Sequence, residues 1–252
     1  MTNSRNIVVV AHRGQVAGFP ENTLAAFRQS VALGFSAIEV DLRTTRDGHI
    51  VILHDDTVDK TTDGSGAVGS LTLAEVKALD AGRGERIPTY EEVLAELRGS
   101  GVKLLLDIKT DGGLDNERVV RLTERYDAAG DVIVGPRTIA DLLDFRHLNS
   151  NLRTLAFVGG PEFEPADVSA IEEFARAGAD LIRLWPPWIF AQPSLIEHMG
   201  ELGKPVWTTA DVEYRDIDPD HPAEQLAELV RLGVEGIITD VPELLASLLA
   251  TR

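Results

Sequence analysis

Cysteine is absent from this chain of 252 residues. Its absence excludes a disulfide scaffold, a thiolate metal site and a cysteine nucleophile. Cationic residues are few, with 24 Lys and Arg against 41 Asp and Glu and a formal net charge of −17. Proteins that bind nucleic acid use Lys and Arg to neutralise phosphates, so this charge balance argues against a nucleic-acid partner.

Long apolar runs are also missing. No stretch approaches the roughly 18 apolar residues that a membrane span needs. Residues 1–6 are polar and lead directly into a strand-like run, which is not the pattern of a signal peptide. Hydrophobic residues make up 44% of the chain, enough for a packed core. We therefore expect a soluble, cytoplasmic protein with one domain over residues 1–252.

Short runs rich in Val, Ile and Leu alternate with helical patterns along the chain. Thr72 and Thr89 each precede a Glu by three residues, which is the spacing of a helix capping box. Eight strand–helix units in about 250 residues are typical of an α/β protein with the (β/α)8 TIM barrel fold. An open doubly wound sheet is the alternative, but the first strand is not followed by a glycine-rich dinucleotide turn. The predicted strands are 7–11, 37–42, 103–108, 132–135, 153–158, 180–185, 205–208 and 236–240.

One segment interrupts this alternation. The interval between Asp41 and His54 is too short for a crossover helix, yet residues 49–53 resemble another strand, and Asp47-Gly48 is a tight-turn signal. These features predict a hairpin that brings His54 back beside Asp41 at the barrel mouth. Residues 55–86 would then form a small insertion over that mouth.

Three carboxylates are predicted to face the barrel interior. In the second strand the apolar residues alternate, which leaves Glu39 and Asp41 pointing inward at the carboxyl end. The same pattern in the third strand leaves Asp107 and Lys109 inward. Buried carboxylates are costly unless a cation lies among them, and oxygen ligands suit Mg²⁺ or Ca²⁺. A network neutralised by Lys and Arg is the alternative interpretation.

His12 and Arg13 end the first strand at the same mouth. A single histidine at a strand end is often a hydrogen-bonded core group, but here His54 is expected at the same rim. Two histidines around an oxygen-ligated metal, with Arg13 and Lys109 nearby, suit the cleavage of a phosphate ester.

These residues belong to an ordered set of motifs. The set resembles that of the glycerophosphodiester phosphodiesterases, over about residues 7–110 and again over 204–245. Each motif is weak alone, and their common order makes the resemblance specific. The motifs are His12-Arg13-Gly14, Pro20-Glu21-Asn22-Thr23, Glu39-Val40-Asp41, Asp47-Gly48, His54-Asp55, Thr61-Thr62-Asp63-Gly64-Ser65-Gly66, Ile87-Pro88-Thr89 and Gly236-Ile237-Ile238-Thr239-Asp240-Val241-Pro242.

The resemblance implies a barrel with a small insertion after His54 and one divalent metal ion as cofactor. It also implies that Glu21 supports the metal or its waters, or contacts the substrate, while Asn22 is expected to cap the first helix. The remaining implied roles are metal ligands for Glu39, Asp41 and Asp107, an acid–base pair for His12 and His54, and phosphate contacts for Arg13 and Lys109.

The chain also departs from the family pattern. Asp107 stands where the family usually has Glu, and 135–137 reads Gly-Pro-Arg in place of Gln-Ser-Phe. Arg183 and Trp185 replace an Asn and a His, and we expect both to face the substrate pocket. Trp207 is retained; it would either line the pocket for the glycerol group or belong to the core.

The expected reaction is metal-dependent hydrolysis of a glycerophosphodiester, a small-molecule substrate, to glycerol 3-phosphate and an alcohol. The sequence leaves open which histidine is the acid, and whether water or the substrate's own hydroxyl attacks. Two alternatives remain: a phosphodiesterase of the same barrel class acting on a lysophospholipid or another phosphodiester, and a catalytically weak barrel that binds a phosphorylated ligand.

Overall fold

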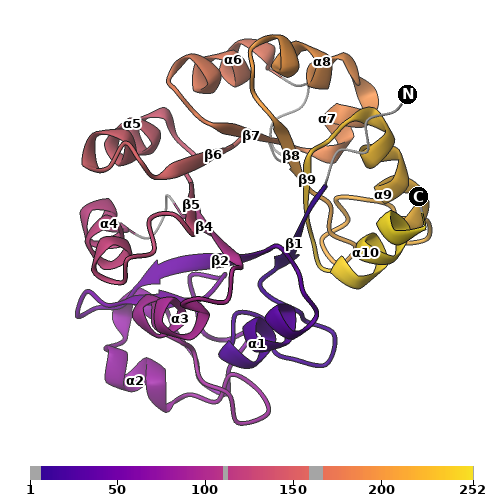
Figure 1. Ribbon diagram of the computed structural model, residues 1–252. Coiled ribbons are helices and arrows are strands. Elements are labelled where there is room, and N and C mark those ends of the chain that lie inside the picture. Colours follow the sequence, from indigo (N-terminus) through magenta and orange to yellow (C-terminus); the bar gives the residue numbers. More distant parts are fainter. Residues whose placement is uncertain (1–6, 110–112, 159–166, 252) are drawn as a thin grey trace.

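The computed structural model describes residues 7–109, 113–158 and 167–251. Within these residues, eight parallel strands form a closed ring with helices outside it (Figure 1). The ring closes because β1 pairs with both β2 and β9. The predicted (β/α)8 barrel is therefore confirmed. Its strands are β1 (Val8–His12), β2 (Ala37–Thr44), β4 (Lys103–Ile108), β5 (Val132–Gly135), β6 (Arg153–Phe157), β7 (Leu181–Leu184), β8 (Val206–Thr209) and β9 (Gly236–Thr239).

Side-chain alternation divides the sheet into two faces. Ile38, Val40 and Leu42 of β2 pack in the layer between the strands and the outer helices. The intervening residues face the barrel interior, where Ala37 belongs to the inner core. This alternation carries the polar residues of β2 to the inside of the ring, as the sequence predicted.

The outer helices begin at recognisable caps. Thr72 and Thr89 both form complete capping boxes, as predicted from their spacing to the following Glu. Thr23, not Asn22, caps the first helix, since the Thr23 hydroxyl accepts from the main-chain nitrogen of Ala26. The helices are α1 (Leu24–Ala32), α2 (Leu73–Ala78), α3 (Tyr90–Leu97), α4 (Asn116–Arg125), α5 (Ile139–Leu148), α6 (Val168–Arg176), α7 (Pro186–Ala191), α8 (Ser194–Glu201), α9 (Pro222–Leu232) and α10 (Pro242–Ala250), with a 3₁₀ turn, η1, at Val68–Ser70. In the part of the chain that the structure describes, no helix is long and apolar enough to cross a membrane.

The predicted hairpin is present. Strand β3 (Ile50–Ile52) runs antiparallel to β2, and the turn between them contains Gly48 at a φ of 82°. The main-chain nitrogen of Leu53 donates to the carbonyl of Asp41 at 3.0 Å. Leu53 is therefore opposite Asp41 and His54 follows it, one residue away from the predicted register.

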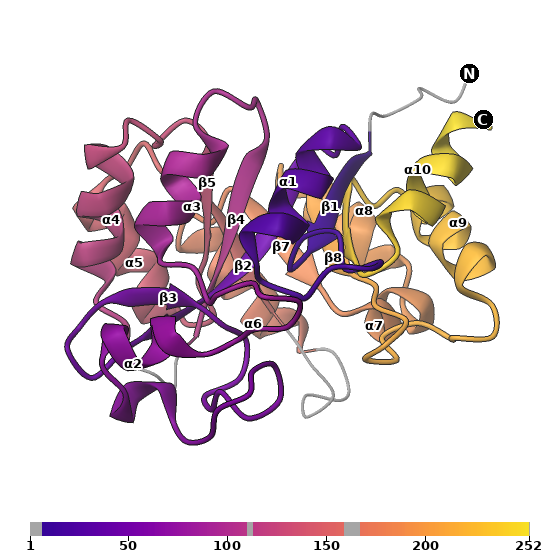
Figure 2. The ribbon, with the colours of Figure 1, turned by 90° about the horizontal axis from the view of Figure 1, so that it is seen from below.

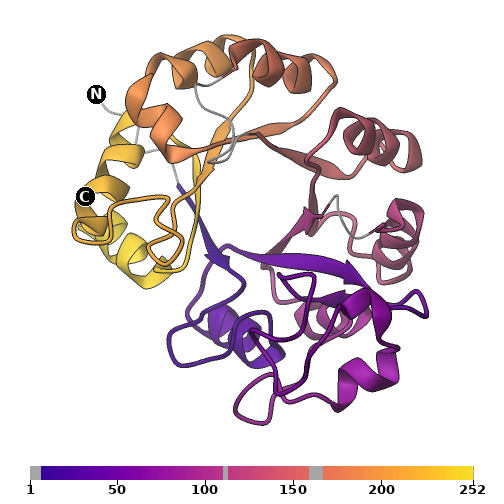
Figure 3. The same ribbon diagram turned by 180° about the vertical axis from the view of Figure 1, so that it is seen from behind.

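Residues 55–86 extend from this hairpin and carry η1 and α2. Val58, Val68 and Val76 of this segment pack against Val51 and Leu53 in a small apolar cluster. In Figure 2, β1 starts near the N-terminus and points toward the end of the barrel where β3 and α2 lie. Figure 3 shows the segment at that end, beside β2 and α3. The segment therefore adjoins the rim at which the strands end.

Candidate active site

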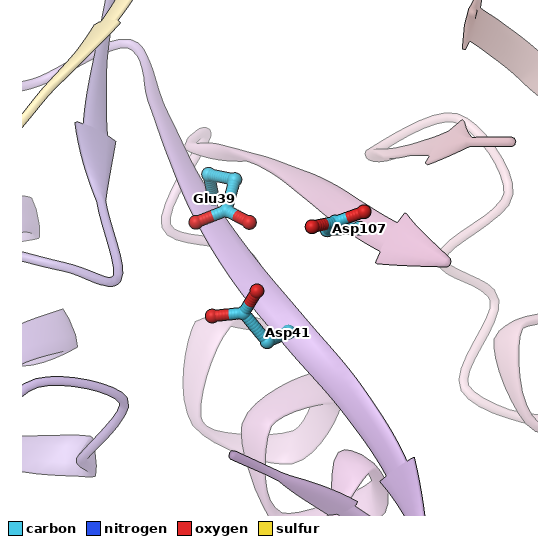
Figure 4. A group of neighbouring side chains, drawn as sticks. All are labelled: Glu39, Asp41 and Asp107. Carbon is cyan, nitrogen blue, oxygen red and sulfur yellow. The ribbon is translucent and has the colours of Figure 1, made fainter. Parts of the chain in front are cut away.

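Three buried carboxylates meet at the carboxyl ends of β2 and β4. Glu39, Asp41 and Asp107 each offer an oxygen atom, and these atoms lie within 4.8 Å of one another (Figure 4). Asp41 is paired directly with Asp107 in the parallel register, and Glu39 lies two residues earlier on the same face. None of the three is more than 3% exposed. The structure thus brings together the three residues that sequence alternation singled out.

The three carboxylates differ in their pKa. Burial and the neighbouring Asp41 raise the pKa of Glu39 to about 8. Burial acts in the same direction on Asp41, but Lys109 and Arg13 outweigh it and hold that pKa well below its usual range. Burial is likewise outweighed at Asp107, where Lys109 and Arg137 lower the pKa. Glu39 is therefore the one carboxylate of the three whose pKa is raised, which favours its protonated form in the absence of a metal.

Two cationic side chains, Lys109 and Arg137, form ion pairs with the Asp107 carboxylate. The Lys109 ammonium lies 2.7 Å from Oδ1 of Asp41 and 2.5 Å from Oδ2 of Asp107. Arg137 makes two parallel hydrogen bonds to Asp107, each of 2.8 Å. A bidentate guanidinium is a strong and directional partner for a carboxylate. The segment that contains Arg137 departs from the family pattern, but no role for Arg137 could be predicted from the sequence because its partner lies on another strand.

Arg13 is held in place by several acceptors. Its main-chain nitrogen donates to Glu39 at 3.2 Å, and its guanidinium donates to Glu21 at 3.0 Å and to the Tyr214 hydroxyl at 2.6 Å. Its Nε lies 3.4 Å from Oδ2 of Asp41. The described contacts of Glu21 are with Arg13, so Glu21 orients the predicted phosphate-binding cation.

The backbone around Arg13 adopts a left-handed turn. Arg13 and Asn22 have φ of 56° and Gly14 has φ of 84°. A Cβ on Gly14 would lie 2.9 Å from the Cβ of Ala26, so the turn needs glycine there. A left-handed conformation costs a non-glycine residue about 1–2 kcal/mol. At Asn22, this left-handed conformation directs the side-chain amide toward Asp41, to which it donates a hydrogen bond at 2.9 Å.

His12 lies between two carboxylates. Its Nδ1 is 2.7 Å from Oδ2 of Asp211, and its Nε2 is 3.6 Å from Oε2 of Glu39. Burial lowers the pKa of His12, but Asp211 and Glu39 outweigh burial and raise it to about 9. Asp211 was not among the residues predicted from the sequence. The signal in the sequence was an acidic residue two positions beyond the carboxyl end of a barrel strand, a region in which barrel enzymes carry functional groups.

His54 reaches the same rim from the hairpin. Its Nδ1 is 2.6 Å from Oδ1 of Asp55. Burial lowers the pKa of His54, although Asp41 opposes this effect. The ring centre of Tyr214 lies 6.3 Å from that of His12 and 6.1 Å from that of His54. Tyr214 comes from the loop after β8, and no motif or spacing in the sequence indicated it.

Arg183 and Trp185 have different surroundings. Arg183 is buried inside the barrel, donates to the Thr209 hydroxyl at 2.9 Å and lies 5.7 Å from the centre of the Phe157 ring. It therefore faces inward, as predicted. Trp185 packs in the apolar layer between strands and helices and donates from its indole nitrogen to Asp216 at 3.0 Å. Its ring is thus part of the outer packing, unlike the predicted pocket wall.

Trp207 is a core residue. It is 3% exposed and belongs to the cluster that fills the barrel. Its ring lies against Gly236, where an added Cβ would be 2.5 Å away. With Val8 and Ala37 it lines a surface recess at the amino ends of the strands, opposite the carboxylates. The suggested contact between Trp207 and the glycerol group of a substrate is therefore not supported.

This geometry can be compared with known proteins. Residues 12–244 match the model of the glycerophosphoryl diester phosphodiesterase family. The chain belongs to this family. A glycerophosphodiester phosphodiesterase of Caldanaerobacter subterraneus subsp. tengcongensis is 32% identical over 254 residues, covering 96% of this chain and 97% of the relative. Membership places the chain among phosphodiester hydrolases.

Solved structures show the same architecture. A glycerophosphoryl diester phosphodiesterase from Parabacteroides distasonis superposes with a TM-score of 0.81 at 26% identity, covering 100% of this chain and 88% of that one. A phosphodiesterase from Oleispira antarctica, solved with the product sn-glycerol-3-phosphate, has a TM-score of 0.82 at 23% identity and covers 96% of both chains. At 23% identity, the similarity to the Oleispira antarctica protein shows a shared fold alone.

The described site suits a hard divalent cation. Three carboxylates converge, and the side-chain oxygen of Asn22 is buried without a hydrogen-bond partner among the described residues. Oxygen donors of this kind are preferred by Mg²⁺ and Ca²⁺. The raised pKa of Glu39 is also consistent with a site that is too anionic until a cation binds. The donor set therefore fits the metal that the family resemblance implies.

Proposed function

We propose that the protein hydrolyses glycerophosphodiesters to glycerol 3-phosphate and an alcohol with the help of one divalent metal ion, Mg²⁺ or Ca²⁺. The observation that carries this proposal is the meeting of three carboxylates with two histidines at one end of the barrel. Each histidine has a carboxylate at Nδ1. Binding alone would not need an acid–base pair.

Glu39, Asp41 and Asp107 would hold the ion. When bound, it would neutralise the negative charge that builds on the phosphoryl oxygens as the ester bond breaks. Lys109 already contacts Asp41 and Asp107 and would lie beside the same oxygens. The acidic chain as a whole repels a phosphodiester, so this local positive charge is needed to bind one.

His12 and His54 would move the protons. One imidazole takes a proton from the attacking hydroxyl or water, and the other gives one to the leaving alcohol oxygen. Asp211 contacts Nδ1 of His12, and Asp55 contacts Nδ1 of His54. The Nε2 atom of each ring is therefore the one left for this proton exchange. Both rings lie beside Tyr214, so both are present at the same end of the barrel.

Arg13 would contact the phosphoryl group. Its guanidinium is already bound by Glu21 and the Tyr214 hydroxyl. Glu21 fixes the orientation of the cation, and a phosphoryl oxygen would share or replace the hydroxyl contact. This arrangement supports a role for Arg13 and Glu21 in binding the substrate.

The test is the release of glycerol 3-phosphate from glycerophosphocholine and glycerophosphoethanolamine by metal-stripped protein, with and without added Mg²⁺ or Ca²⁺. We expect turnover only with metal, and a loss on the order of 10²-fold or more in His12→Ala and in His54→Ala. His147→Ala is the matched control, because His147 is an exposed residue of α5. Near-normal turnover in both site variants would remove the histidines from the mechanism.

Lysophospholipids and other phosphodiesters form a second arm of this assay. Arg183 adds a buried cation to the barrel interior, and this is the reason to test substrates with a different alcohol group. Turnover of these substrates alone would change the substrate class. Binding of glycerol 3-phosphate without turnover of any diester would favour the catalytically weak binding barrel.

A further inference from the structure

Asp211 has both carboxylate oxygens engaged by donors from separate elements. It is 1% exposed and follows β8. Oδ1 accepts from the main-chain nitrogen of Asp240 at 3.0 Å, and Oδ2 lies 2.7 Å from Nδ1 of His12. The carboxylate therefore joins the turn after β9 to the last residue of β1 across the barrel mouth.

These contacts determine which nitrogen of His12 carries a proton. An ionised carboxylate can only accept hydrogen bonds, so the partner atom Nδ1 must be protonated. The donor from Asp240 is a main-chain N–H, which cannot act as an acceptor. Nε2 then becomes the atom that exchanges a proton on the side of Glu39, 3.6 Å away.

We propose that Asp211 is a positioning residue that holds the His12 ring with Nδ1 protonated and Nε2 directed at the carboxylate cluster. The effect on catalysis rests on the function proposed above, whereas the state of the ring does not. Asp55 stands in the same relation to His54, but there the side chains are 30% and 32% exposed. For the His12 pair the corresponding values are 11% and 2%, so water can replace Asp55 more easily than Asp211.

A purely structural role for Asp211 would be to fasten the loop after β8. That loop has another anchor, because the carboxylate of Asp240 accepts from the main-chain nitrogens of Val212 at 2.9 Å and Glu213 at 2.8 Å. Within the described part of the chain, no side-chain contact joins Asp240 to His12. Asp240→Asn is therefore the matched control, since it disturbs the same loop without changing the partner of the histidine.

The decisive variant is Asp211→Asn, which keeps the shape of the side chain. With its oxygen facing the Asp240 N–H, its amide group faces His12 and forces Nδ1 to act as an acceptor. The proton then moves to Nε2, the wrong atom for the exchange. By analogy with the catalytic triad, this change is expected to lower kcat on the order of 10²- to 10⁴-fold. KM should change by no more than about threefold, since the interaction acts in the transition state.

Two measurements separate this proposal from the function on which its catalytic effect rests. The first is proton NMR of the metal-free protein, in which the Nδ1–H of His12 should give a strongly downfield resonance. We expect this resonance in the wild type, Asp240→Asn and Asp55→Asn, and its loss in Asp211→Asn and His12→Ala. Its absence from the wild type, or its persistence in Asp211→Asn, would overturn the proposal whether or not the protein is active.

The second measurement is kinetic. If Asp211 acts through His12, the double variant Asp211→Asn/His12→Ala should be no less active than His12→Ala alone. A further tenfold loss in the double variant would show that Asp211 acts elsewhere. Normal kcat in Asp211→Asn, with an active wild type, would also refute the proposal. An inactive wild type that shows the resonance would instead refute the phosphodiesterase function and leave the positioning contact established.

Discussion

Glu39→Gln should make the metal-free protein more stable. Glu39 is 2% exposed, and burial with Asp41 raises its pKa from 4.5 to about 8. Below pH 4.5 the carboxyl is protonated in the folded and unfolded states, and it makes no difference to stability. As the pH rises from 4.5 to 8, the unfolded chain loses this proton before the folded protein does, so the free energy of unfolding falls. Gln carries no such proton and avoids this loss.

The size of the effect follows from the pKa. A difference of about 3.5 pH units at about 1.36 kcal/mol each gives an upper limit of about 5 kcal/mol above pH 8. Gln also loses the attraction to His12, whose Nε2 is 3.6 Å from Glu39. We therefore expect a gain of about 2–4 kcal/mol at pH 8.5 and less than about 1 kcal/mol at pH 5.

The assay is urea unfolding in the presence of EDTA at both pH values. Glu96→Gln is the control, because Glu96 lies on α3 and forms an exposed pair with Arg28. A Glu39→Gln protein that is no more stable than the wild type at pH 8.5 would refute the reasoning. Adding saturating Mg²⁺ or Ca²⁺ should reverse the order, since ligand binding stabilises the folded wild type and the variant lacks one of the three proposed metal ligands.

Three further changes test separate parts of the structure. Arg137→Gln removes the bidentate partner of Asp107, so isothermal titration should show Mg²⁺ or Ca²⁺ binding about three- to tenfold tighter, and weaker binding would contradict this competition. Tyr214→Phe removes an acceptor shared by two cations; steady-state kinetics should show KM changing more than kcat, and an unchanged KM would exclude a role in binding. Gly236→Ala places a Cβ 2.5 Å from the Trp207 ring and should destabilise the fold by about 1–3 kcal/mol in urea, where an unchanged midpoint would show that the ring can move.

Prediction and structure agreed best where the local periodicity of the sequence determines the direction of the side chains. Alternation in β2 and β4 placed Glu39, Asp41 and Asp107 inside the barrel, and the structure brings all three together. The turn signal at Asp47-Gly48 predicted the hairpin that returns His54 to the rim, with an error of one residue in register. Period-two patterns and short turns can be read from neighbouring residues, because they depend on backbone geometry alone.

The errors occurred where local sequence left two outcomes open. Asn22 and Thr23 are both good helix caps, and the strained turn at Arg13 assigned the cap to Thr23 and directed Asn22 to Asp41. Trp207 was equally compatible with pocket and core until the strand positions placed it at the amino ends. Trp185 lies just beyond β7, where strand alternation no longer determines the direction of a side chain.

From the sequence alone, the barrel, the carboxylate cluster and the two histidines could be predicted, since each depends on which residues alternate within a strand and where that strand ends. The partners of these residues depended on the closed ring. Asp211 and Tyr214, about 200 residues after His12 in the chain, lie beside it because β8 and β9 complete the ring next to β1. Arg137 reaches Asp107 because β5 is paired with β4. Contacts between strands and loops distant in the sequence have no local periodicity, so only the tertiary structure could determine them.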